Sequence, residues 1–589
     1  MKRRVADIVM DILVEHDIVD CFAVVGGGAM YLDNALALND RINKYFNHHE
    51  QACAMAAEAY ARLSGKMALV CVTSGPGATN AITGVMGAWQ DSLPMIVLSG
   101  QVRYAISVPK SGLKLRYRGI QEFEIIPSVK NMTKYAVQIT DPLSIKQELL
   151  KAIDIAMEGR RGPVWLDIPQ DIQSAIVEED ELYDYIKEEI TYPYVDYNYI
   201  VQTLKDAKRP CILAGSGIRS GDVMPEFVSF INELGIPVVG GAWVSDNLYY
   251  EHPLYFGNSG NIGPRTGNFI LQNADVILSL GNSLGFRQTG FNQEGFAPKS
   301  KIIMVDADDA EGKKPGINLY AFVHRPLKMF FEEFPNKKID VDQQWIEYCN
   351  DLKKRFSEFE GIGDLDLNSR VNSYYFWKIF EKYEAEDSII SLGNNTANTA
   401  KLQIGVKKKN QRVITNYTCG SMGYDIPAAI GSAVASKKKV ICVTGDGSIM
   451  MNLQELQTIK HYNLPINIVV FSNDGYAAIR QTSKSFFNGL YIGCTKDTGI
   501  SFPSFEEVAK TFGFKYIAIK DNASVDDKLN EMFKSDEKVL LEVSQMYDNP
   551  VTPKLLSRLD ENGEMKSPVL HDMAPFLDKK EIDSLMFKY

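Results

Sequence analysis

Short apolar runs alternate with longer segments of helical periodicity along most of the chain. The clearest example begins with "KKVICVTGD" (438–446), a β-branched run that stops at glycine and predicts a buried strand. In "SIMMNLQELQTIKHYN" (448–463), Ile449, Leu453, Leu456 and Ile459 recur at helical spacing, and "PINIVVFSND" (465–474) predicts a second strand. Strand, helix and strand in this order predict a βαβ unit with parallel strands and a right-handed crossover.

The same alternation divides the chain into three α/β segments. An acidic, Tyr-rich stretch (178–198) predicts a linker after the first segment, and a charged helix (343–361) leads from the second into the third. We therefore expect three doubly wound domains with parallel sheets, at residues 1–180, 195–345 and 370–545. The remaining residues, 546–589, carry scattered proline and charge and predict a tail that wraps the surface.

Polar side chains follow the two strands of the 438–474 unit. Ligands of parallel α/β sheets gather at the carboxyl ends of the strands, where Asp446 and Asn473 are expected to face each other. Carboxylate, amide and carbonyl oxygens suit Mg²⁺ or Ca²⁺. Gly445 and Gly447 permit close approach of a bulky anion, and a helix beginning at Ser448 favours phosphate. The alternative is an ordinary strand-to-helix turn that binds nothing.

Two further stretches in the first segment point to chemistry. Glu50 stands at a strand-to-helix junction in "YFNHHEQACAMAAEAYARLSG" (45–65), although the helix dipole alone would favour a glutamate there. "TSGPGATN" (73–80) lies between two β-rich runs and predicts either a ligand cradle or a tight turn.

Composition and charge exclude several classes of protein. The 589 residues carry a formal net charge of −11, which argues against nucleic acid or an anionic membrane as the main partner. No apolar run reaches membrane-spanning length, and acidic residues interrupt any signal-peptide core near the start. The eight cysteines are dispersed without a CxxC pair, which predicts reduced thiols in a cytoplasmic protein.

Several motifs, taken in order, resemble one known family. "TSGPGATNAITGV", "DSLPMIVLSGQV", "LDIPQDIQ", "GSMGYDIPAAIGSAVA" and "GDGSIMMNLQELQTI" are similar to thiamine-diphosphate-dependent enzymes, and among them to the acetolactate synthase (acetohydroxyacid synthase) large subunit. The resemblance covers nearly the whole chain except the tail. It implies an aminopyrimidine-binding, a central FAD-type and a diphosphate-binding domain. It also implies a homodimer or homotetramer whose active site lies between the first domain of one subunit and the last domain of another.

The resemblance assigns residues to the cofactor and the metal. Mg²⁺ would be held by Asp446, Asn473 and the Gly475 carbonyl, with Ser472 standing where the family usually has asparagine. The residues matching those that hold thiamine diphosphate are Gly393, Asn394, Asn395, Thr396, Met422, Gly445, Gly447 and Ser448, with Met422 as the bulky residue that supports the thiazolium ring.

Three residues carry over as catalytic. Glu50 matches the glutamate that hydrogen-bonds the pyrimidine N1′, where a carboxyl in a dry pocket can share a proton. Gly28 would donate its backbone N–H to a developing oxyanion, and Gln121 matches an active-site glutamine. Its neighbour Ile120 replaces the usual phenylalanine, which alters the acceptor wall.

The central segment resembles the family's flavin-binding region. The matched positions are Gly257, Asn258, Ser259, Arg287 and Asp306, with FAD expected but an empty inherited fold as the alternative. "AGSGIRSG" (214–221) has the wrong spacing for a dinucleotide fingerprint and is not assigned to a ligand.

The implied reaction removes CO₂ from a 2-keto acid, with pyruvate expected, and transfers the two-carbon unit to an acceptor carbonyl. Residues 103–125 lack the histidine pair of pyruvate decarboxylases, which disfavours simple decarboxylation. Ala477 and Ala478 replace larger residues of the synthase channel, so a nucleotide-linked keto-sugar from a surface-polysaccharide pathway is the alternative acceptor. A non-catalytic homologue and a nicotinamide dehydrogenase are the more distant alternatives.

Overall fold

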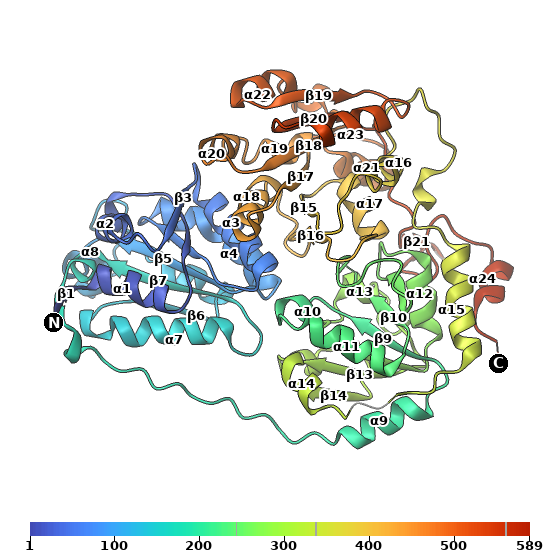
Figure 1. The fold of residues 1–589 in the computed structure, drawn as a ribbon, viewed down its shortest axis with the longest axis horizontal. Coiled ribbons are helices and arrows are strands. Elements are labelled where there is room, and N and C mark those ends of the chain that lie inside the picture. The colour runs from blue at the N-terminus through green and yellow to red at the C-terminus, as the bar shows by residue number, and fades with distance from the viewer. Residues whose placement is uncertain (243, 336–337, 560–561, 589) are drawn as a thin grey trace.

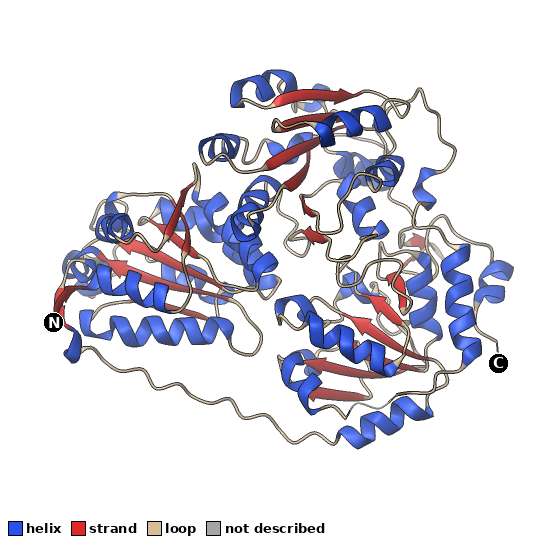
Figure 2. Ribbon diagram, in the orientation of Figure 1, coloured by secondary structure: helices blue, strands red, loops and turns tan. Residues whose placement is uncertain are grey.

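Three six-stranded parallel sheets, each flanked by helices, form the chain in the computed structural model, which describes residues 1–242, 244–335, 338–559 and 562–588. Figure 2 shows the three sheets, with helices packed against them. The predicted fold class of three doubly wound α/β domains is therefore confirmed.

The N-terminal domain has the strand order β3-β2-β4-β5-β7-β6. Its strands are β1 (Lys2–Arg4), β2 (Asp20–Ala23), β3 (Asn43–Phe46), β4 (Leu69–Val72), β5 (Met95–Gln101), β6 (Tyr135–Gln138), β7 (Pro163–Pro169) and β8 (Ile176–Glu178), where β1 and β8 form a separate antiparallel pair. Its helices are α1 (Val5–Glu15), α2 (Met30–Leu38), α3 (Glu50–Ser64), α4 (Pro76–Gln90), α5 (Val108–Ser111), α6 (Ile125–Val129), α7 (Ile145–Met157) and α8 (Gln170–Gln173).

The central domain has the order β11-β10-β9-β12-β13-β14. Its strands are β9 (Pro210–Ala214), β10 (Val238–Gly240), β11 (Tyr255–Asn258), β12 (Val276–Leu280), β13 (Lys301–Asp306) and β14 (Ala321–His324). Its helices are α9 (Tyr197–Asp206), α10 (Gly217–Ser220), α11 (Met224–Leu234), α12 (Arg265–Asn273), α13 (Phe286–Thr289), α14 (Leu327–Glu333) and α15 (Gln343–Arg355).

The C-terminal domain has the order β16-β15-β17-β18-β20-β19. Its strands are β15 (Ile389–Leu392), β16 (Arg412–Ile414), β17 (Val440–Gly445), β18 (Ile466–Ser472), β19 (Lys515–Ile519) and β20 (Val539–Ser544). Its helices are α16 (Ser373–Phe380), α17 (Thr396–Ile404), α18 (Asp425–Ser436), α19 (Asp446–Ile449), α20 (Glu455–His461), α21 (Ala477–Phe486), α22 (Phe505–Phe512) and α23 (Val525–Lys534). The tail adds β21 (Arg558–Leu559), β22 (Met565–Lys566) and α24 (Lys579–Leu585).

The helix expected over 448–463 is interrupted. α19 ends at Ile449 and α20 begins at Glu455, with turns between them. Asn452 lies in this break, and its side chain donates to the Gly423 carbonyl at 2.8 Å and to Gln51 Oε1 at 3.1 Å. Because these bonds reach other parts of the fold, periodicity within the segment does not reveal the break.

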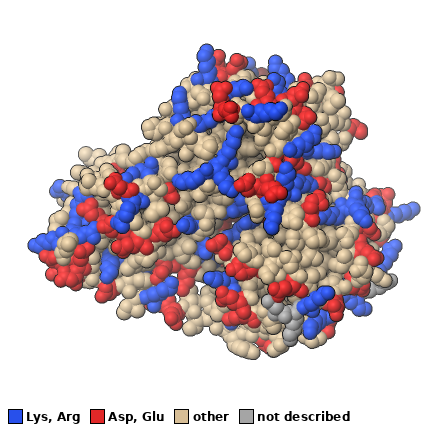
Figure 3. All heavy atoms as spheres, in the orientation of Figure 1, with Lys and Arg blue, Asp and Glu red and all other residues tan. Residues whose placement is uncertain are grey.

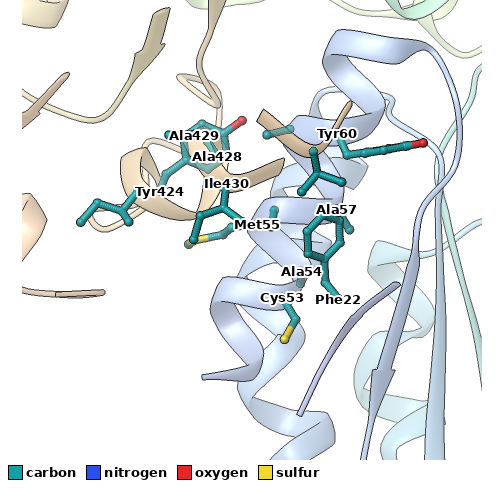
Figure 4. Close-up of a cluster of buried hydrophobic side chains, with 14 of the residues drawn as sticks. Phe22, Cys53, Ala54, Met55, Ala57, Tyr60, Tyr424, Ala428, Ala429 and Ile430 are labelled. Atoms are coloured by element: carbon teal, nitrogen blue, oxygen red, sulfur yellow. The ribbon is translucent and has the colours of Figure 1, made fainter. Parts of the chain in front are cut away.

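The first and last domains pack directly on each other through α3 and α18, although the central domain separates them in sequence. Their small residues let the helices approach closely, since a Cβ on Gly431 would clash with the Ala56 carbonyl. Phe22, Met55 and Ile430 belong to one buried cluster that spans both domains. Figure 4 shows Ala54, Met55 and Ala57 of α3 alongside Ala428 to Ile430 of α18.

An extended segment joins the N-terminal domain to α9 of the central domain (Figure 1). Lys, Arg, Asp and Glu are interspersed over the visible face in Figure 3, without a large patch of one sign. In the described part of the chain, each cysteine is free and every helix falls short of the length and apolarity needed to cross a bilayer.

Candidate active site

Asp446 and Asn473 face each other because β17 and β18 are neighbouring parallel strands in register. Asp446 Oδ2 accepts the backbone N–H groups of Asn473 (2.9 Å) and Gly475 (3.3 Å), and Oδ1 accepts that of Gly447 (2.8 Å). Burial raises the pKa of the Asp446 carboxyl to about 6, and the three N–H bonds act in the opposite direction. The carboxylate is thus fixed at the carboxyl edge of the sheet.

Asn473 is oriented by two side chains that sequence patterns did not single out. Its Nδ2 donates to Gln545 Oε1 at 2.9 Å, and its Oδ1 accepts from Arg480 Nη2 at 3.1 Å. Arg480 is fully buried, and its Nε and Nη1 have no hydrogen-bond partner within the described structure. A single arginine on a helical segment carries no motif, so only its hydrogen bonds to Asn473 and to the Tyr547 carbonyl (2.6 Å) identify its role.

A cavity of about 340 Å³ opens beside Asp446. Its wall includes Asn394, Asn395, Thr396, Met422, Gly445, Asp446, Gly447, Ser448, Asn473 and Gly475, which are the expected cofactor and metal positions other than Gly393. A Cβ on Gly447 would overlap the ring of Tyr476, so only glycine leaves this wall open. The Gly393 carbonyl instead accepts from Asn398 Nδ2 at 2.8 Å.

Ser448 and Asn395 have defined roles around the cavity. Ser448 Oγ donates to Asp425 Oδ2 at 2.7 Å and accepts the Gly423 N–H at 2.9 Å, which holds the loop carrying Met422. Asn395 caps α17 by accepting the Asn398 N–H at 2.9 Å. Its Nδ2 is buried without an acceptor in the described structure and so remains as a donor beside the cavity.

These donors fit a Mg²⁺–diphosphate group. Mg²⁺ is usually bound through one or two carboxylates together with ligand phosphates and water, rather than by an all-protein cage. The described residues contain no group of three His, Cys, Asp or Glu side chains placed to hold a metal. The site offers a metal ion one buried carboxylate, one amide oxygen and one backbone carbonyl, and the unpaired Asn395 amide lies beside them. This set fits a cation that is bound partly by the protein and partly by the oxygens of an anionic ligand.

The catalytic candidates cluster around the loop at residues 73–77. Asn80 Nδ2 donates to Glu50 Oε2 at 2.9 Å, and a Cβ on Gly77 would lie 3.3 Å from Glu50 Oε1. Gly28 N–H donates to Thr73 Oγ1 at 3.0 Å. Since that N–H already has an acceptor, the geometry supports packing, rather than oxyanion binding, as the role of Gly28 in this structure.

Gln121 reaches the same loop from the other side. It has a positive φ of 60°, and its carbonyl packs against Gly75, where any side chain would clash. Ile120 beside it is 91% exposed. Glu50, Gly28 and Gln121 thus all lie against the 73–77 loop of the N-terminal domain.

Within one chain, the described wall of the Asp446 cavity contains no residue of the Glu50 cluster. The described wall of the cavity comes from the central domain, the C-terminal domain and the tail, without a residue of the first domain. Within the chain, α3 contacts the C-terminal domain through α18 and through the hydrogen bond between Gln51 and Asn452. The arrangement leaves the two halves of the expected site apart.

A second cleft lies between the N-terminal and central domains. A cavity of about 280 Å³ includes Arg160, Ser216, Gly217, Gly281 and Asp306, and one of about 390 Å³ includes Asn282, Arg287 and Gln288. The two cavities share Asp91, Ser216, Ser283 and Thr418, so they form one elongated cleft. Arg287 and Asp306, two of the five positions expected to bind flavin, line this cleft.

Gly257, Asn258 and Ser259 are absent from the described walls of this cleft. Asn258 Nδ2 donates to the Leu402 carbonyl at 2.9 Å, and Ser259 Oγ donates to the Gly240 carbonyl at 2.8 Å. The "AGSGIRSG" loop, which sequence spacing left unassigned, does line the cleft. Gly217 makes this possible, because a Cβ there would lie 2.8 Å from Gly281 Cα.

Comparison with protein-family models gives three matches in chain order. Residues 3–122 match the thiamine pyrophosphate enzyme N-terminal TPP binding domain, 197–328 match the central domain, and 391–543 match the C-terminal TPP binding domain.

Curated relatives span most of the chain. It is 31% identical to a probable acetolactate synthase large subunit of Methanococcus aeolicus over 560 residues, which cover 88% of each chain. It is 30% identical to the acetolactate synthase isozyme 2 large subunit of Escherichia coli (strain K12), covering 89% of this chain and 92% of the relative. It is 28% identical to the chloroplastic acetolactate synthase 2 of Zea mays, covering 96% and 89%.

Proposed function

Because the chain belongs to the thiamine pyrophosphate enzyme family, we propose that it is a Mg²⁺-dependent carboligase that uses thiamine diphosphate. It decarboxylates a 2-keto acid, pyruvate in the first instance, and transfers the two-carbon unit to an acceptor carbonyl, as in acetolactate synthesis. When bound, thiamine diphosphate supplies the carbanion chemistry that removes CO₂.

The observation that carries the proposal is the geometry around Asp446. Its carboxylate is fixed by the N–H groups of Asn473 and Gly475 at the wall of a cavity that also contains Met422. Asp446, Asn473 Oδ1 and the Gly475 carbonyl would hold Mg²⁺, while Asn395 and Gly447 would border the diphosphate. Met422 gives the cavity an apolar wall against which a ring can lie.

Glu50 would hold or release a proton at the pyrimidine ring. Asn80 fixes one of its oxygens and Gly77 allows close approach to the other. Because Glu50 does not line the Asp446 cavity of its own chain, we propose a homo-oligomer in which Glu50 of one subunit completes the cavity of another. The surface near the 73–77 loop, where Ile120 is 91% exposed, is suited to such a contact.

FAD is proposed for the cleft between the first two domains. Ser216, Gly217 and Gly281 lie at the carboxyl ends of β9 and β12, where α/β sheets bind nucleotides. Of the positions expected from sequence to bind FAD, Arg287 and Asp306 remain part of the proposed site. Gly257, Asn258 and Ser259 do not, because they contact other parts of the protein instead.

One feature of the cavity favours an alternative acceptor substrate that is larger than pyruvate. Ala477 and Ala478 line its wall at the start of α21, and their small side chains leave room for an acceptor larger than pyruvate. A nucleotide-linked keto-sugar is the alternative acceptor for the same decarboxylation.

Product analysis by NMR tests the proposal. Purified protein with Mg²⁺ and thiamine diphosphate is incubated with pyruvate, with and without a nucleotide-linked 4-keto-sugar. Acetolactate from pyruvate alone supports the first acceptor, and a branched product formed only with the sugar supports the second. Absence of CO₂ release under both conditions would refute the proposed donor chemistry.

A further inference from the structure

The tail contributes a cation to the candidate active-site cavity. Val551 and Lys554 line its wall together with Ile262, Tyr417 and Gln481. The Lys554 backbone is fixed at both polar groups, because its N–H donates to the Ala574 carbonyl (3.0 Å) and its carbonyl accepts from the Ala574 N–H (2.8 Å). The side chain is therefore presented from a paired segment rather than from a free end.

Buried polar contacts hold the tail against the central domain. Arg265 is 1% exposed and donates to the carbonyls of Met573 (3.2 Å) and Pro575 (2.6 Å). Asn268 Nδ2 donates to the Leu570 carbonyl at 3.0 Å. If the tail were released, the buried donors of Arg265 and Asn268 would lose these three carbonyl acceptors. Because an unpaired buried donor costs free energy, the docked position of the tail is favoured.

The same docking connects Lys554 to the Gly257–Ile262 segment. The Leu555 N–H donates to the Asn261 carbonyl at 2.7 Å, and the Asn261 N–H donates to the Arg287 carbonyl at 2.8 Å. This segment, which contains the Gly257–Ser259 positions expected from sequence to bind flavin, thus positions the tail beside Ile262 at the cavity wall.

The Lys554 ammonium has no hydrogen-bonded or ion-paired anion among the residues that the structure describes. Another cation of the tail differs, since Arg558 pairs with Asp572 at 2.6 Å. Burial lowers the pKa of Lys554, as expected for a partly desolvated ammonium without a compensating anion. A cation held in a cavity without a counter-charge is a binding group for an anion.

A second cation contacts a residue of the cavity wall. The Arg287 guanidinium carbon is 4.7 Å from the centre of the Tyr417 ring, and Tyr417 lines both the active-site cavity and the neighbouring cleft. Asp446 and Asn473, the proposed metal ligands, line this cavity from the C-terminal domain, whereas Lys554 comes from the tail. The cavity therefore has a cation for which the metal–diphosphate assignment gives no role.

We propose that Lys554 binds an anionic group of the acceptor substrate in the active-site cavity. This inference rests on the proposed function for the identity of the acceptor. The anion is the carboxylate of a second keto acid or the diphosphate of a nucleotide-linked sugar, and both offer oxygen acceptors to the ammonium. Lys554 is thus a specificity-determining residue contributed by the tail.

Binding to the enzyme loaded with Mg²⁺ and thiamine diphosphate tests the inference without turnover. Oxamate probes a keto-acid carboxylate and uridine diphosphate probes a nucleotide diphosphate, each titrated calorimetrically into wild type, Lys554→Met, Lys554→Gln and Lys554→Arg. We expect Met and Gln to weaken one probe at least tenfold and Arg to restore most of the affinity. The exposed tail residue Lys579, changed to Met, is the matched control and should leave both affinities unchanged.

The affected probe identifies the anion. Weaker oxamate binding indicates a carboxylate, and weaker uridine diphosphate binding indicates a diphosphate. Steady-state kinetics should agree, with the acceptor KM raised at least tenfold and the rate of CO₂ release at saturating donor changed less than twofold.

Two results would overturn the inference. One is unchanged affinity for both probes in Lys554→Met and Lys554→Gln. The other is a loss of thiamine diphosphate affinity in these variants, which would assign Lys554 to the cofactor. Failure of wild type to release CO₂ would refute the proposed donor chemistry separately, while the binding comparison would still decide the role of Lys554.

Discussion

At the scale of single residues, comparison of Asp446 with Asp474 tests the assignment of Asp446 to the metal. Asp446 is 2% exposed in the cavity wall, whereas the Asp474 side chain is 63% exposed and pairs with Arg370 at 2.7 Å. We expect Asp446→Ala to weaken Mg²⁺-dependent binding of thiamine diphosphate by about 100-fold, roughly 2.7 kcal/mol, because it removes the one buried carboxylate of the donor set.

Asp474→Ala is the matched control and should change that affinity less than threefold. The measurement is calorimetric titration of thiamine diphosphate at fixed Mg²⁺. Equal effects of the two substitutions would contradict the assignment of Asp446 to the metal.

Glu381 is not one of the candidate site residues, and its carboxyl predicts that the stability of the protein depends on pH. Burial raises its pKa to about 7, and Oε1 has no hydrogen-bond partner within the described structure. The folded pKa exceeds the unfolded value, so the folded state holds the extra proton and stability falls as pH rises from about 4.5 to 7. The full penalty, at most about 3 kcal/mol, is present above pH 7.

Glu381→Gln removes this titration. We expect the variant to gain stability relative to wild type as pH rises through this window, with no further gain from pH 8 to 9. Thermal unfolding midpoints of both proteins at pH 5, 6, 7, 8 and 9 measure this difference in stability. A difference between the two proteins that is independent of pH would contradict the assigned titration.

At the scale of elements, the contact between α3 and α18 depends on Gly431. A Cβ there would clash with the Ala56 carbonyl on the facing helix, and rigid backbone cannot move as a side chain would. Gly431→Ala should therefore lower stability by about 1–3 kcal/mol, despite the better helix propensity of alanine. The expected readout is a lower unfolding midpoint in calorimetry.

Gly87→Ala in α4 is the control for that substitution. Its Cβ would meet Asn416 Nδ2 at 3.6 Å, an ordinary contact, so alanine should be neutral or stabilise by up to ~1 kcal/mol. A stable Gly431→Ala variant would mean that α3 and α18 can separate at little cost.

At the scale of the whole molecule, the separation of Glu50 from the Asp446 cavity predicts complementation between subunits. Glu50→Gln should keep cofactor binding but abolish turnover, and Asp446→Ala should be inactive for lack of cofactor. In a mixed dimer, one site combines the intact Glu50 of one chain with the intact Asp446 of the other. Co-expression of the two variants should thus recover up to about a quarter of wild-type activity, by random pairing of chains.

Purification through two different affinity tags isolates the mixed species for the assay. Each variant expressed alone is the control and should remain inactive. Absence of activity in the mixed species would mean that both groups act from one chain.

Sequence patterns predicted the three sheets and the facing of Asp446 and Asn473, because parallel strands bring their carboxyl ends to one edge. They did not predict Arg480, Gln545 or the break at Asn452, whose roles depend on contacts between distant segments. The position of the "AGSGIRSG" loop in the wall of the cleft was not predicted, because its glycines serve contact with Gly281 rather than a fingerprint spacing. The position of Lys554 in the cavity wall was not predicted, because a tail without periodicity gives no signal of where it docks.

The docking of the tail across two domains also orders events during synthesis. Leu570, Met573 and Pro575 emerge from the ribosome after both the central and the C-terminal domain, and their carbonyls bind Arg265 and Asn268, which are synthesised much earlier. A nascent chain can therefore fold both domains while the wall at Lys554 is still missing. The cavity acquires its last wall only when translation has passed the domains that form the rest of it.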